Sequence, residues 1–497
     1  MIAKHHILMI MLLLGFVSLE ADEVINSRTV DSLSYRYYQE QKWDSLLWIG
    51  KIALDHHIDF YYLRMRMGIA EFERERYIAA ERHFEKALFF DDHSYPARSY
   101  LYFARDYGGK QSKALRFSRT FSEQQLAEQG IRIPKIASVT LLGGYSLSNN
   151  FSGNGALDLL GSDGVMGTQL LMGNMAIASA GLTLNLSRSF RLSVSLTNEW
   201  VQTRNRFQYQ RISYTKTKRP IGQNGSYVND FKKNTSAGEI VYNSSIRQTE
   251  LYLNPAFQFD RGFSLGLFAN MLFIRSSQYN GQIQPETRVD TLRYNAITGI
   301  YTPVVLQETD FASGQNDTTF VNFTTGIYLV KDFGYFTMDL TGSYSRLYQL
   351  DQFQSDFSIT YYPLGSLKLY GITGIGVYFT PGTEVTERQA RLLFNQRIGV
   401  GITKRLWLEG EYWKGNLKNV NIRRGLVVFN LPDEIDFVAA LKLTYFSTKH
   451  LVLYFRYDFA AKSGGYLKEK DLDGKNPQVI TFDYQTQNFI GGLQWKF

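Results

Sequence analysis

The chain ends on the stretch QNFIGGLQWKF, residues 487–497, in which the character of the residues alternates. Counted back from the end by twos, one set of positions is aromatic, aliphatic or glycine: Phe497, Trp495, Leu493, Gly491 and Phe489. Side chains along a β-strand point in turn to its two faces. The stretch therefore predicts a strand with one apolar face and one face that is mostly polar or small.

The same period of two extends back through the sequence as far as Lys135. In one clear segment we expect an outward apolar face made of Ile435, Phe437, Ala439, Leu441, Leu443 and Tyr445, against inward Asp436, Lys442 and Thr444. About fourteen strands are predicted, near residues 136–147, 173–187, 190–206, 242–258, 263–278, 318–330, 335–348, 352–362, 367–379, 388–401, 405–419, 434–446, 450–461 and 479–497.

The connections between these strands alternate in length. Short turns are expected at 187–190, 260–262, 331–334, 363–366, 403–404 and 447–449, and longer links near 148–172, 207–241 and 279–317. Transmembrane barrels have short periplasmic turns, long outer loops and an even number of strands. A soluble β-sandwich or lectin would explain the alternation, but neither the loop asymmetry nor the terminal Phe497. The pattern predicts an antiparallel transmembrane β-barrel over residues 131–497.

Composition limits the class of protein further. Aromatic residues make up 15% of the 497 residues, which suits aromatic girdles at two membrane interfaces. Mean hydropathy is −0.24, too polar for a bundle of membrane helices. The absence of cysteine excludes disulfides, thiol metal sites and lipidation at an N-terminal cysteine. A formal charge of +8 would serve either general solubility or contact with an anionic surface such as lipopolysaccharide. It does not require a nucleic-acid partner.

The first residues resemble a secretory signal. Lys4 precedes an apolar run over residues 7–17, and small Ala21 follows it. We expect a signal peptide over residues 1–21, cleaved after Ala21. The alternative is an uncleaved anchor helix, for which the apolar run is short.

Residues 22–130 have helical periodicity and repeat themselves with a period of 34. The best unit carries Gly68, Phe72, Tyr77, Ala80, Phe84 and Ala87, with Trp43 and Ala53 as equivalents in the preceding unit. This pattern of small and aromatic residues resembles the tetratricopeptide consensus. The resemblance implies packed helix pairs that dock a partner protein; a short helical plug or collar is the alternative. His56, His57 and the run 91–93 fall at predicted turns, so we expect solvated turns and no metal site.

Charged residues of both signs are predicted to face the lumen of the barrel. They are Arg191, Glu199, Asp339, Arg397, Arg405, Glu409, Glu411, Lys442, Arg456 and Asp458. About fourteen strands lie between the filled barrels of eight strands and the open ones of sixteen to eighteen. The charges would form either a constriction for a polar solute or a salt-bridged lumen wall.

A basic and aromatic stretch occupies one predicted outer loop. Its cations are Arg204, Arg206, Arg211, Lys216, Lys218, Arg219, Lys232 and Lys233. It would bind sugar phosphates or an acidic polysaccharide, or it is a solvated loop beside lipopolysaccharide. Catalysis has little support, because His450 is the one histidine of the barrel region and falls at a predicted periplasmic turn. We expect neither an enzyme nor a cofactor.

The terminal residues Phe489, Gly491, Leu493, Trp495 and Phe497 resemble the last strand of Gram-negative outer-membrane barrels, which implies recognition by the barrel-assembly machinery. The whole arrangement, an α+β multi-domain chain, resembles outer-membrane proteins with a periplasmic tetratricopeptide module, such as YaiO-type and exopolysaccharide-export barrels. The exporters carry many more repeats.

Three functions stay open from the sequence. The first is transport or envelope assembly, with the repeats docking a periplasmic protein; a charge-lined open lumen would favour it. The second is a non-conducting structural or adhesion barrel that acts through its outer loops; a closed lumen with ordered loops would favour that. The third and most distant is a membrane-embedded enzyme, which a polar cluster at the rim would support.

Overall fold

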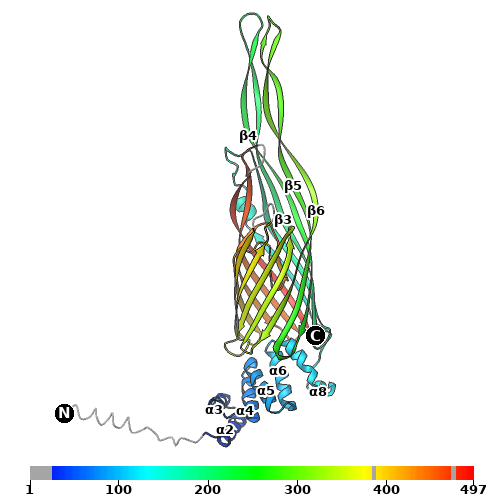
Figure 1. The fold of residues 1–497 in the computed structure, drawn as a ribbon, viewed down its shortest axis with the longest axis vertical. Coiled ribbons are helices and arrows are strands. Elements are labelled where there is room, and N and C mark those ends of the chain that lie inside the picture. Colours follow the sequence, from blue (N-terminus) through cyan, green and yellow to red (C-terminus); the bar gives the residue numbers. More distant parts are fainter. Residues whose placement is uncertain (1–24, 383–387, 472–476) are drawn as a thin grey trace, which may run out of the picture. The chain divides into compact units, whose positions relative to one another are not determined.

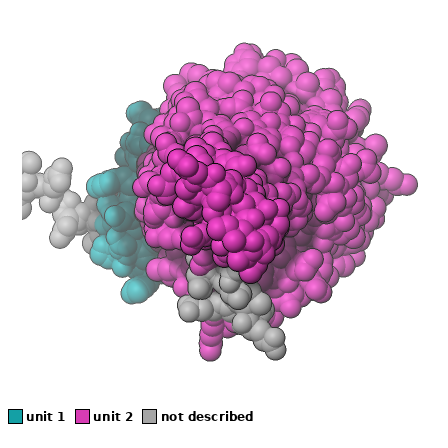
Figure 2. Space-filling model, turned by 90° about the horizontal axis from the view of Figure 1, so that it is seen from above, with its two compact units in different colours: residues 1–114 teal, residues 115–497 magenta. Residues whose placement is uncertain are grey.

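The computed structural model describes residues 25–382, 388–471 and 477–497. The predicted signal peptide lies outside these residues. The chain divides into two compact units, residues 1–114 and 115–497 (Figure 2), each of which is described by itself. The division falls before the predicted boundary at residue 130, because the last helical residues belong to the barrel unit.

The first unit is a row of helices, α2 (Ser27–Gln39), α3 (Trp43–Asp55), α4 (Tyr61–Glu73), α5 (Tyr77–Phe90) and α6 (Tyr95–Tyr107), followed by α7 (Gln111–Phe117), whose last residues belong to the second unit. The starts of α2, α4 and α6 are spaced by 34 residues, and so are those of α3, α5 and α7. The predicted period is therefore present in the structure, while membership of the tetratricopeptide class stays a prediction. Among the described helices, none has the length and apolarity needed to cross a membrane.

The predicted small and aromatic residues lie between these helices. Ala53, Ala80, Phe84 and Ala87 are completely buried, and Phe72 meets Tyr77 edge-on with 5.1 Å between ring centroids. Small residues let the helix backbones approach, and aromatic rings fill the remaining space. Gly68 is the tightest example, because the ring of Phe84 lies where a Cβ on this glycine would be.

Two glycines of this unit allow a matched prediction. We expect Gly68→Ala to destabilise the helices by about 1–3 kcal/mol, because the added methyl meets the rigid Phe84 ring. Gly50→Ala should be neutral or stabilising by up to about 1 kcal/mol, because it meets only the flexible Met67 side chain and gains helix propensity. Thermal loss of the helical circular dichroism signal in the full chain measures both. Equal destabilisation by the two variants would contradict the proposed packing.

The second unit is a closed antiparallel barrel of fourteen described strands (Figure 1). The strands are β1 (Ile136–Ser148), β2 (Met166–Asn185), β3 (Phe190–Pro220), β4 (Tyr227–Gln258), β5 (Phe263–Asn295), β6 (Ile300–Asp332), β7 (Phe336–Leu347), β8 (Leu350–Tyr361), β9 (Leu369–Thr380), β10 (Gln389–Gly401), β11 (Leu406–Lys414), β14 (Glu434–Phe446), β15 (Leu451–Glu469) and β16 (Gln478–Lys496). The predicted closed antiparallel barrel and its strand number are confirmed.

The terminal strand closes the ring. In β16, Trp495 lies opposite Val139 of β1 and Phe489 lies opposite Tyr145. The predicted apolar face points outward, with Trp495 44% and Phe497 55% exposed. The first and last strands therefore meet at the same end of the barrel as the short turns.

Two of the predicted long links are themselves β-structure. The pairs β3–β4 and β5–β6 continue far beyond the other strands as tall hairpins, residues 207–241 and 279–317, here called the stalk (Figure 1). Aromatic rings join the two hairpins: Tyr209 stacks on Phe311 at 4.5 Å and Tyr242 on Tyr279 at 4.4 Å. Period-two alternation does not show where a strand leaves the barrel wall, so the sequence ended these strands too early.

Two predicted faces are wrong at the start of β14: Ile435 faces inward, and Asp436, which bonds the outward Ser463 hydroxyl, faces outward. The register of β14 against β15 shifts between Ile435 and Phe437, which is the signature of a β-bulge. The extra residue returns Ile435 to the inside, where it is 5% exposed in an apolar cluster. The remaining outward residues of this strand keep their predicted face.

The segment that leads into the barrel packs against two short turns. It contains the short helices η1 (Ser118–Thr120) and α8 (Glu123–Glu128). Arg116 donates to the Asp260 carboxylate from Nε and from Nη2, each at 3.0 Å. Arg188 donates to the Ser118 carbonyl at 3.0 Å. The chain therefore enters the barrel at its short-turn end.

Candidate functional site: a hairpin inside the lumen

The connection from β11 to β14, residues 415–433, folds back into the barrel. It contains a small two-stranded sheet, β12 (Val420–Ile422) paired with β13 (Val427–Phe429). We call this segment the lumen hairpin. Its sequence has a hairpin pattern, two short apolar runs separated by Arg423, Arg424 and Gly425, but nothing in that pattern shows that it turns inward.

Apolar side chains of the lumen hairpin pack against most of the barrel wall. Leu417, Val420 and Ile422 form one buried cluster with wall residues Tyr378, Leu393, Ile435, Val438 and Ala460. Val428 joins a second, with Leu171, Met172, Val201, Ile246, Leu272, Ile274, Leu347, Tyr466, Phe482 and Tyr484. The two clusters together include residues from ten of the wall strands, and the hairpin lies among them inside the barrel.

Polar side chains fix the stem of the hairpin in register with the wall. Asn421 donates to Ser343 Oγ at 3.0 Å, and its carbonyl accepts from Gln354 at 2.8 Å. On the other side Asn430 donates to Gln248 at 2.7 Å. Buried amides paired in this way specify one position, because any shift would leave polar groups without partners.

The tip of the hairpin spans from one wall to another. Arg423 binds Glu411 on β11 at 2.5 Å, whereas Arg424 binds Asp339 on β7 and lies 3.8 Å from the Tyr328 ring centroid. Both arginines have positive φ, 55° and 59°. Such conformations are costly for residues with a Cβ, so the ion pairs hold a strained tip in place.

Glu411 is the centre of the lumen charges. Its side chain is 1% exposed and also accepts from Arg397 at 2.6 Å, Arg456 at 2.7 Å and the Trp413 ring nitrogen at 2.9 Å. These charges form the salt-bridged wall that the sequence left as one alternative. Arg423 completes the cluster and could not be found from strand alternation.

Some of the other predicted lumen charges lie beside this centre, two bind elsewhere on the wall, and one does not face the lumen. Asp458 binds Arg456, Glu409 pairs with Arg397 at 3.7 Å, and Lys442 is on the adjoining inward face of β14. Arg191 bonds Asn185, and Glu199 shares the Gln248 amide with Glu250. Arg405 is exposed in the turn before β11, so its assignment to the lumen was wrong: the strand begins one residue later.

The predicted basic outer patch is divided among separate partners. Arg206 is buried against Glu239, Arg204 lies over Phe151, and Lys218 lies over Tyr227. Other cations pair with carboxylates of the stalk: Arg211 with Asp310, Lys216 with Asp290, and Arg219 with Asp230. Lys232 and Lys233 are exposed. Two of these ion pairs, Arg211 with Asp310 and Lys216 with Asp290, join the two stalk hairpins.

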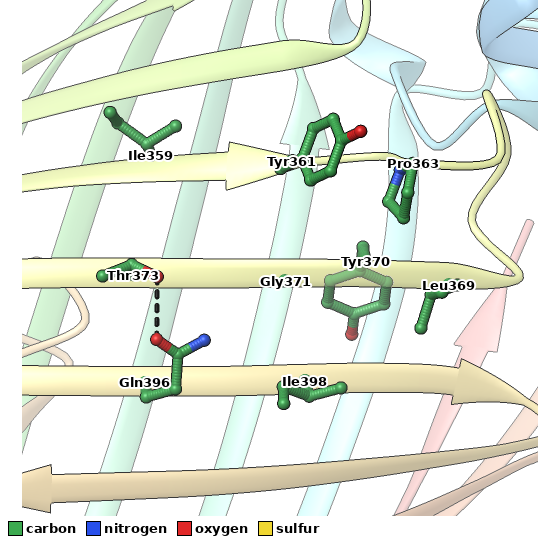
Figure 3. Close-up of a pocket in the computed structure, with 9 residues that line it drawn as sticks. All are labelled: Ile359, Tyr361, Pro363, Leu369, Tyr370, Gly371, Thr373, Gln396 and Ile398. Carbon is green, nitrogen blue, oxygen red and sulfur yellow. Dashed lines mark hydrogen bonds between the residues drawn. The ribbon is translucent and has the colours of Figure 1, made fainter.

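A groove of about 480 Å³ lies on the barrel wall near the short turns of β8, β9 and β10 (Figure 3). Ile359, Tyr361 and Ile398 line it, and Gly371 leaves its floor open. Among these apolar residues, the Thr373 hydroxyl donates to the Gln396 side-chain carbonyl at 2.7 Å, so these two polar groups bond each other. Tyr361 and Ile398 are outward-facing, so the groove is outside the lumen.

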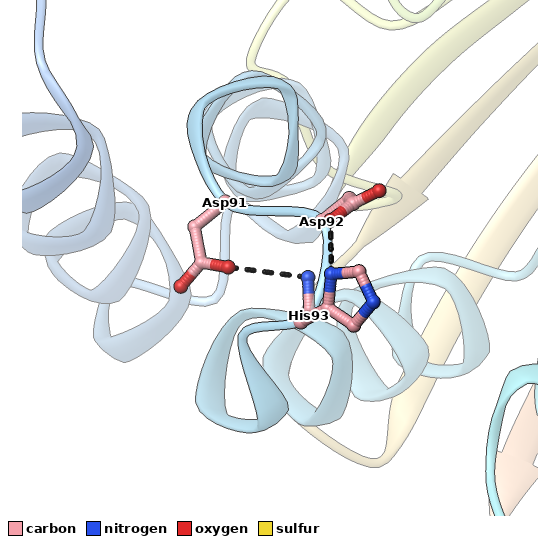
Figure 4. A group of neighbouring side chains, drawn as sticks. All are labelled: Asp91, Asp92 and His93. Atoms are coloured by element: carbon pink, nitrogen blue, oxygen red, sulfur yellow. Dashed lines mark hydrogen bonds and ion pairs between the residues drawn. The ribbon is translucent and has the colours of Figure 1, made fainter.

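A second small group lies in the turn between α5 and α6. Asp91, Asp92 and His93 are all exposed, and their ligand atoms lie within 4.8 Å of one another (Figure 4). The His93 ring bonds Asp92, and the His93 amide bonds Asp91 at 3.2 Å. The sequence predicts a solvated turn here, and exposed acidic residues alone do not define a metal site.

The helical unit contains a buried ion cluster of its own. Glu81 is 2% exposed and binds Arg105 at 2.9 Å, Lys110 at 2.6 Å and Lys113 at 2.5 Å. Burial raises the pKa of Glu81, but these three cations outweigh it and lower the pKa well below its ordinary value. Burial, and then the charge of Arg64, lowers the pKa of His83 to about 4.

These two groups make the helical unit sensitive to acid. Between about pH 6.5 and 4 the unfolded chain binds a proton on His83 that the folded unit does not, so stability falls as pH falls. Glu81 contributes stability above about pH 4.5 that is lost in stronger acid. We expect helical melting in the full chain to drop by several degrees from pH 7 to 4.5. His83→Gln should flatten the upper part of this window; an unchanged slope would contradict the assignment.

No protein-family profile and no curated protein matches the chain. Solved structures similar to it include a Pseudomonas aeruginosa FadL homologue, 10% identical over 79% of this chain and 94% of that one, with a TM-score of 0.40. The P. putida toluene transporter TodX is 7% identical over 77% and 94%, with a TM-score of 0.33. The translocator domain of autotransporter NalP from Neisseria meningitidis is 9% identical over 78% and 98%, with a TM-score of 0.26. At these scores we draw no functional inference from the likenesses.

Proposed function

We propose that this chain is an outer-membrane barrel that is closed at rest and acts through surfaces on its two sides. The outward face supports the membrane placement: Leu267, Leu340, Ile375, Ile398 and Leu441 are each 49–52% exposed. A continuous apolar band of this kind is unfavourable in water and suits lipid. The helical unit would then be periplasmic, because the chain enters the barrel at the short-turn end.

The single observation that carries the closed state is the lumen hairpin. Leu417, Val420, Ile422 and Val428 are each at most 8% exposed. Moving these four side chains into water would cost on the order of 10 kcal/mol. This cost is far above the thermal energy, so we expect the open state to be a small minority without a partner. The hairpin thus acts as a plug, not as a freely fluctuating gate.

With a closed lumen, function would reside in the stalk on the extracellular side and in the helical repeats on the periplasmic side. We propose that the repeats dock a periplasmic protein and that the stalk contacts the cell exterior. Delivery to the membrane would use the barrel-assembly machinery, through the terminal strand. No enzymatic role is proposed, because the His450 Nδ1 atom lies 2.8 Å from the Lys496 carbonyl and its ring stacks on Trp495, both at the short-turn end.

Transport is the second candidate, and one observation favours it. The tip of the lumen hairpin is strained at Arg423 and Arg424, and strain at such a site is often released in a functional step. Opening would require a partner or solute that supplies the energy lost from the apolar clusters. Export of a polysaccharide would be one form of this second candidate.

Planar-bilayer recording on the mature full chain tests the proposal. We expect long silent periods without steady conductance, because the lumen hairpin fills the pore. Steady single-channel conductance of the unmodified chain would contradict the closed state and restore transport as the leading function.

A further inference from the structure

The short-turn end of the barrel carries an excess of positive charge. Each short connection contains or adjoins a lysine or arginine, and the short-turn end also holds Lys496: Arg188, Arg261, Lys331, Lys368, Lys404, Arg405, Lys449 and Lys496. Asp260 and Asp332 are the acidic residues of these connections in the part that the structure describes. Asp260 is bound by Arg116, and Arg188 is bound by Glu123, so both belong to the packing of the entry segment.

Six other cations of these connections form what we call the basic collar: Arg261, Lys331, Lys368, Lys404, Arg405 and Lys449. Several of them, including Arg261, Arg405 and Lys449, are exposed. Outward aromatic residues lie directly beside the collar on the barrel wall, among them Phe263, Phe336, Tyr361, Tyr445 and Trp495. Lys331 of the collar lies 4.1 Å from the centroid of the Phe263 ring, so a collar cation contacts an outward aromatic residue.

A ring of cations next to an aromatic girdle is the arrangement that meets the head-group layer of a bilayer. At the stalk end, two of the basic residues pair with carboxylates of the second hairpin, Arg211 with Asp310 and Lys216 with Asp290. The short-turn cations therefore lie where the head groups of that leaflet would be, and contact of the outer basic patch with lipopolysaccharide stays a prediction.

We propose that the basic collar binds anionic glycerophospholipid head groups in the leaflet at the short-turn end. This inference rests on the proposed membrane placement. A phosphate diester with a net negative charge complements the collar, whereas a zwitterionic head group does not. Each lysine or arginine near an anionic surface contributes about fivefold in affinity at moderate salt, and the effect is screened as ionic strength rises.

The test uses the full chain refolded into phosphatidylcholine vesicles with or without phosphatidylglycerol. Native mass spectrometry of the extracted protein counts the retained lipids. We expect preferential retention of phosphatidylglycerol by the unmodified chain, loss of the preference in high salt, and about 25-fold weaker retention in the double variant Arg405→Gln/Lys449→Gln. The matched control, Lys232→Gln/Lys233→Gln in the stalk, changes the charge equally and should retain the lipid.

Equal retention of both lipids by the unmodified chain would overturn the inference, and so would loss of the preference in the stalk variant. Heat-modifiable migration of each protein on gels reports folding and insertion separately. A folded, inserted barrel without lipid preference would contradict the basic collar alone. Failure to insert into any vesicle would contradict the membrane placement itself.

Discussion

Replacing the lumen hairpin, residues 415–433, with a short glycine–serine link is expected to turn a silent barrel into a steady channel. The hairpin's apolar clusters contain residues from ten wall strands, and in the proposed closed state they block the lumen. A barrel of fourteen strands is wider than those that side chains alone can fill. Charges that now bind the tip, Glu411 and Asp339, would then line an aqueous path.

Single-channel recording of the deletion variant measures this outcome, with heat-modifiable migration as the check that the barrel still closes. Leu426→Ala is the matched control, because this tip residue is 43% exposed and its loss should leave the plug in place. Silence of a correctly folded deletion variant would mean that other side chains or loops block the lumen, and the hairpin would lose its role as plug.

Glu411→Gln is expected to destabilise the folded barrel by about 3–5 kcal/mol, the usual cost of removing one partner from a buried ion cluster. The carboxylate is 1% exposed and binds Arg397, Arg423 and Arg456. Without it these guanidinium groups repel one another in a poorly solvated space. Because Arg423 is on the lumen hairpin, the repulsion should also push the tip away from β11 and produce brief channel openings.

A double variant separates the two effects. Glu411→Gln combined with Arg423→Gln removes one of the three uncompensated charges and should recover part of the lost stability, which a double-mutant cycle would quantify. Urea unfolding in detergent gives the free energies, and bilayer recording gives the openings. Simple additivity of the two substitutions would show that Arg423 and Glu411 do not interact, against the 2.5 Å contact between them.

Acid acts on the helical unit by a different route from these substitutions. Its sensitivity arises from Glu81 and His83, whose pKa values are both lowered in the folded state. The Gly68 and Gly50 variants probe the packing of the same helices without changing any charge. Together they distinguish loss of helix packing from loss of the buried ion cluster.

The sequence by itself determined the barrel and its strand number. Alternation with a period of two is a local property: each residue's face follows from its neighbour's, and the short turns give the chain direction. The terminal strand ending in Phe497 followed from the same rule, and the same alternation put Glu411, Arg397 and Arg456 on faces where they form ion pairs. The predicted faces of Arg405 and Ile435 were wrong, because a strand start and a β-bulge each interrupt the period of two.

Only the tertiary structure decided what fills the lumen. Asn421 meets Ser343, and Asn430 meets Gln248, across 78 and 182 residues of chain. The hairpin pattern in the sequence is the same whether the hairpin turns inward or into solvent. Its inward turn therefore depends on the apolar space that fourteen strands create together. The stalk is a similar case, because the ion pair between Lys216 and Asp290 forms only when the two hairpins lie side by side. Contacts of this kind are set by closure of the barrel, which no local pattern contains.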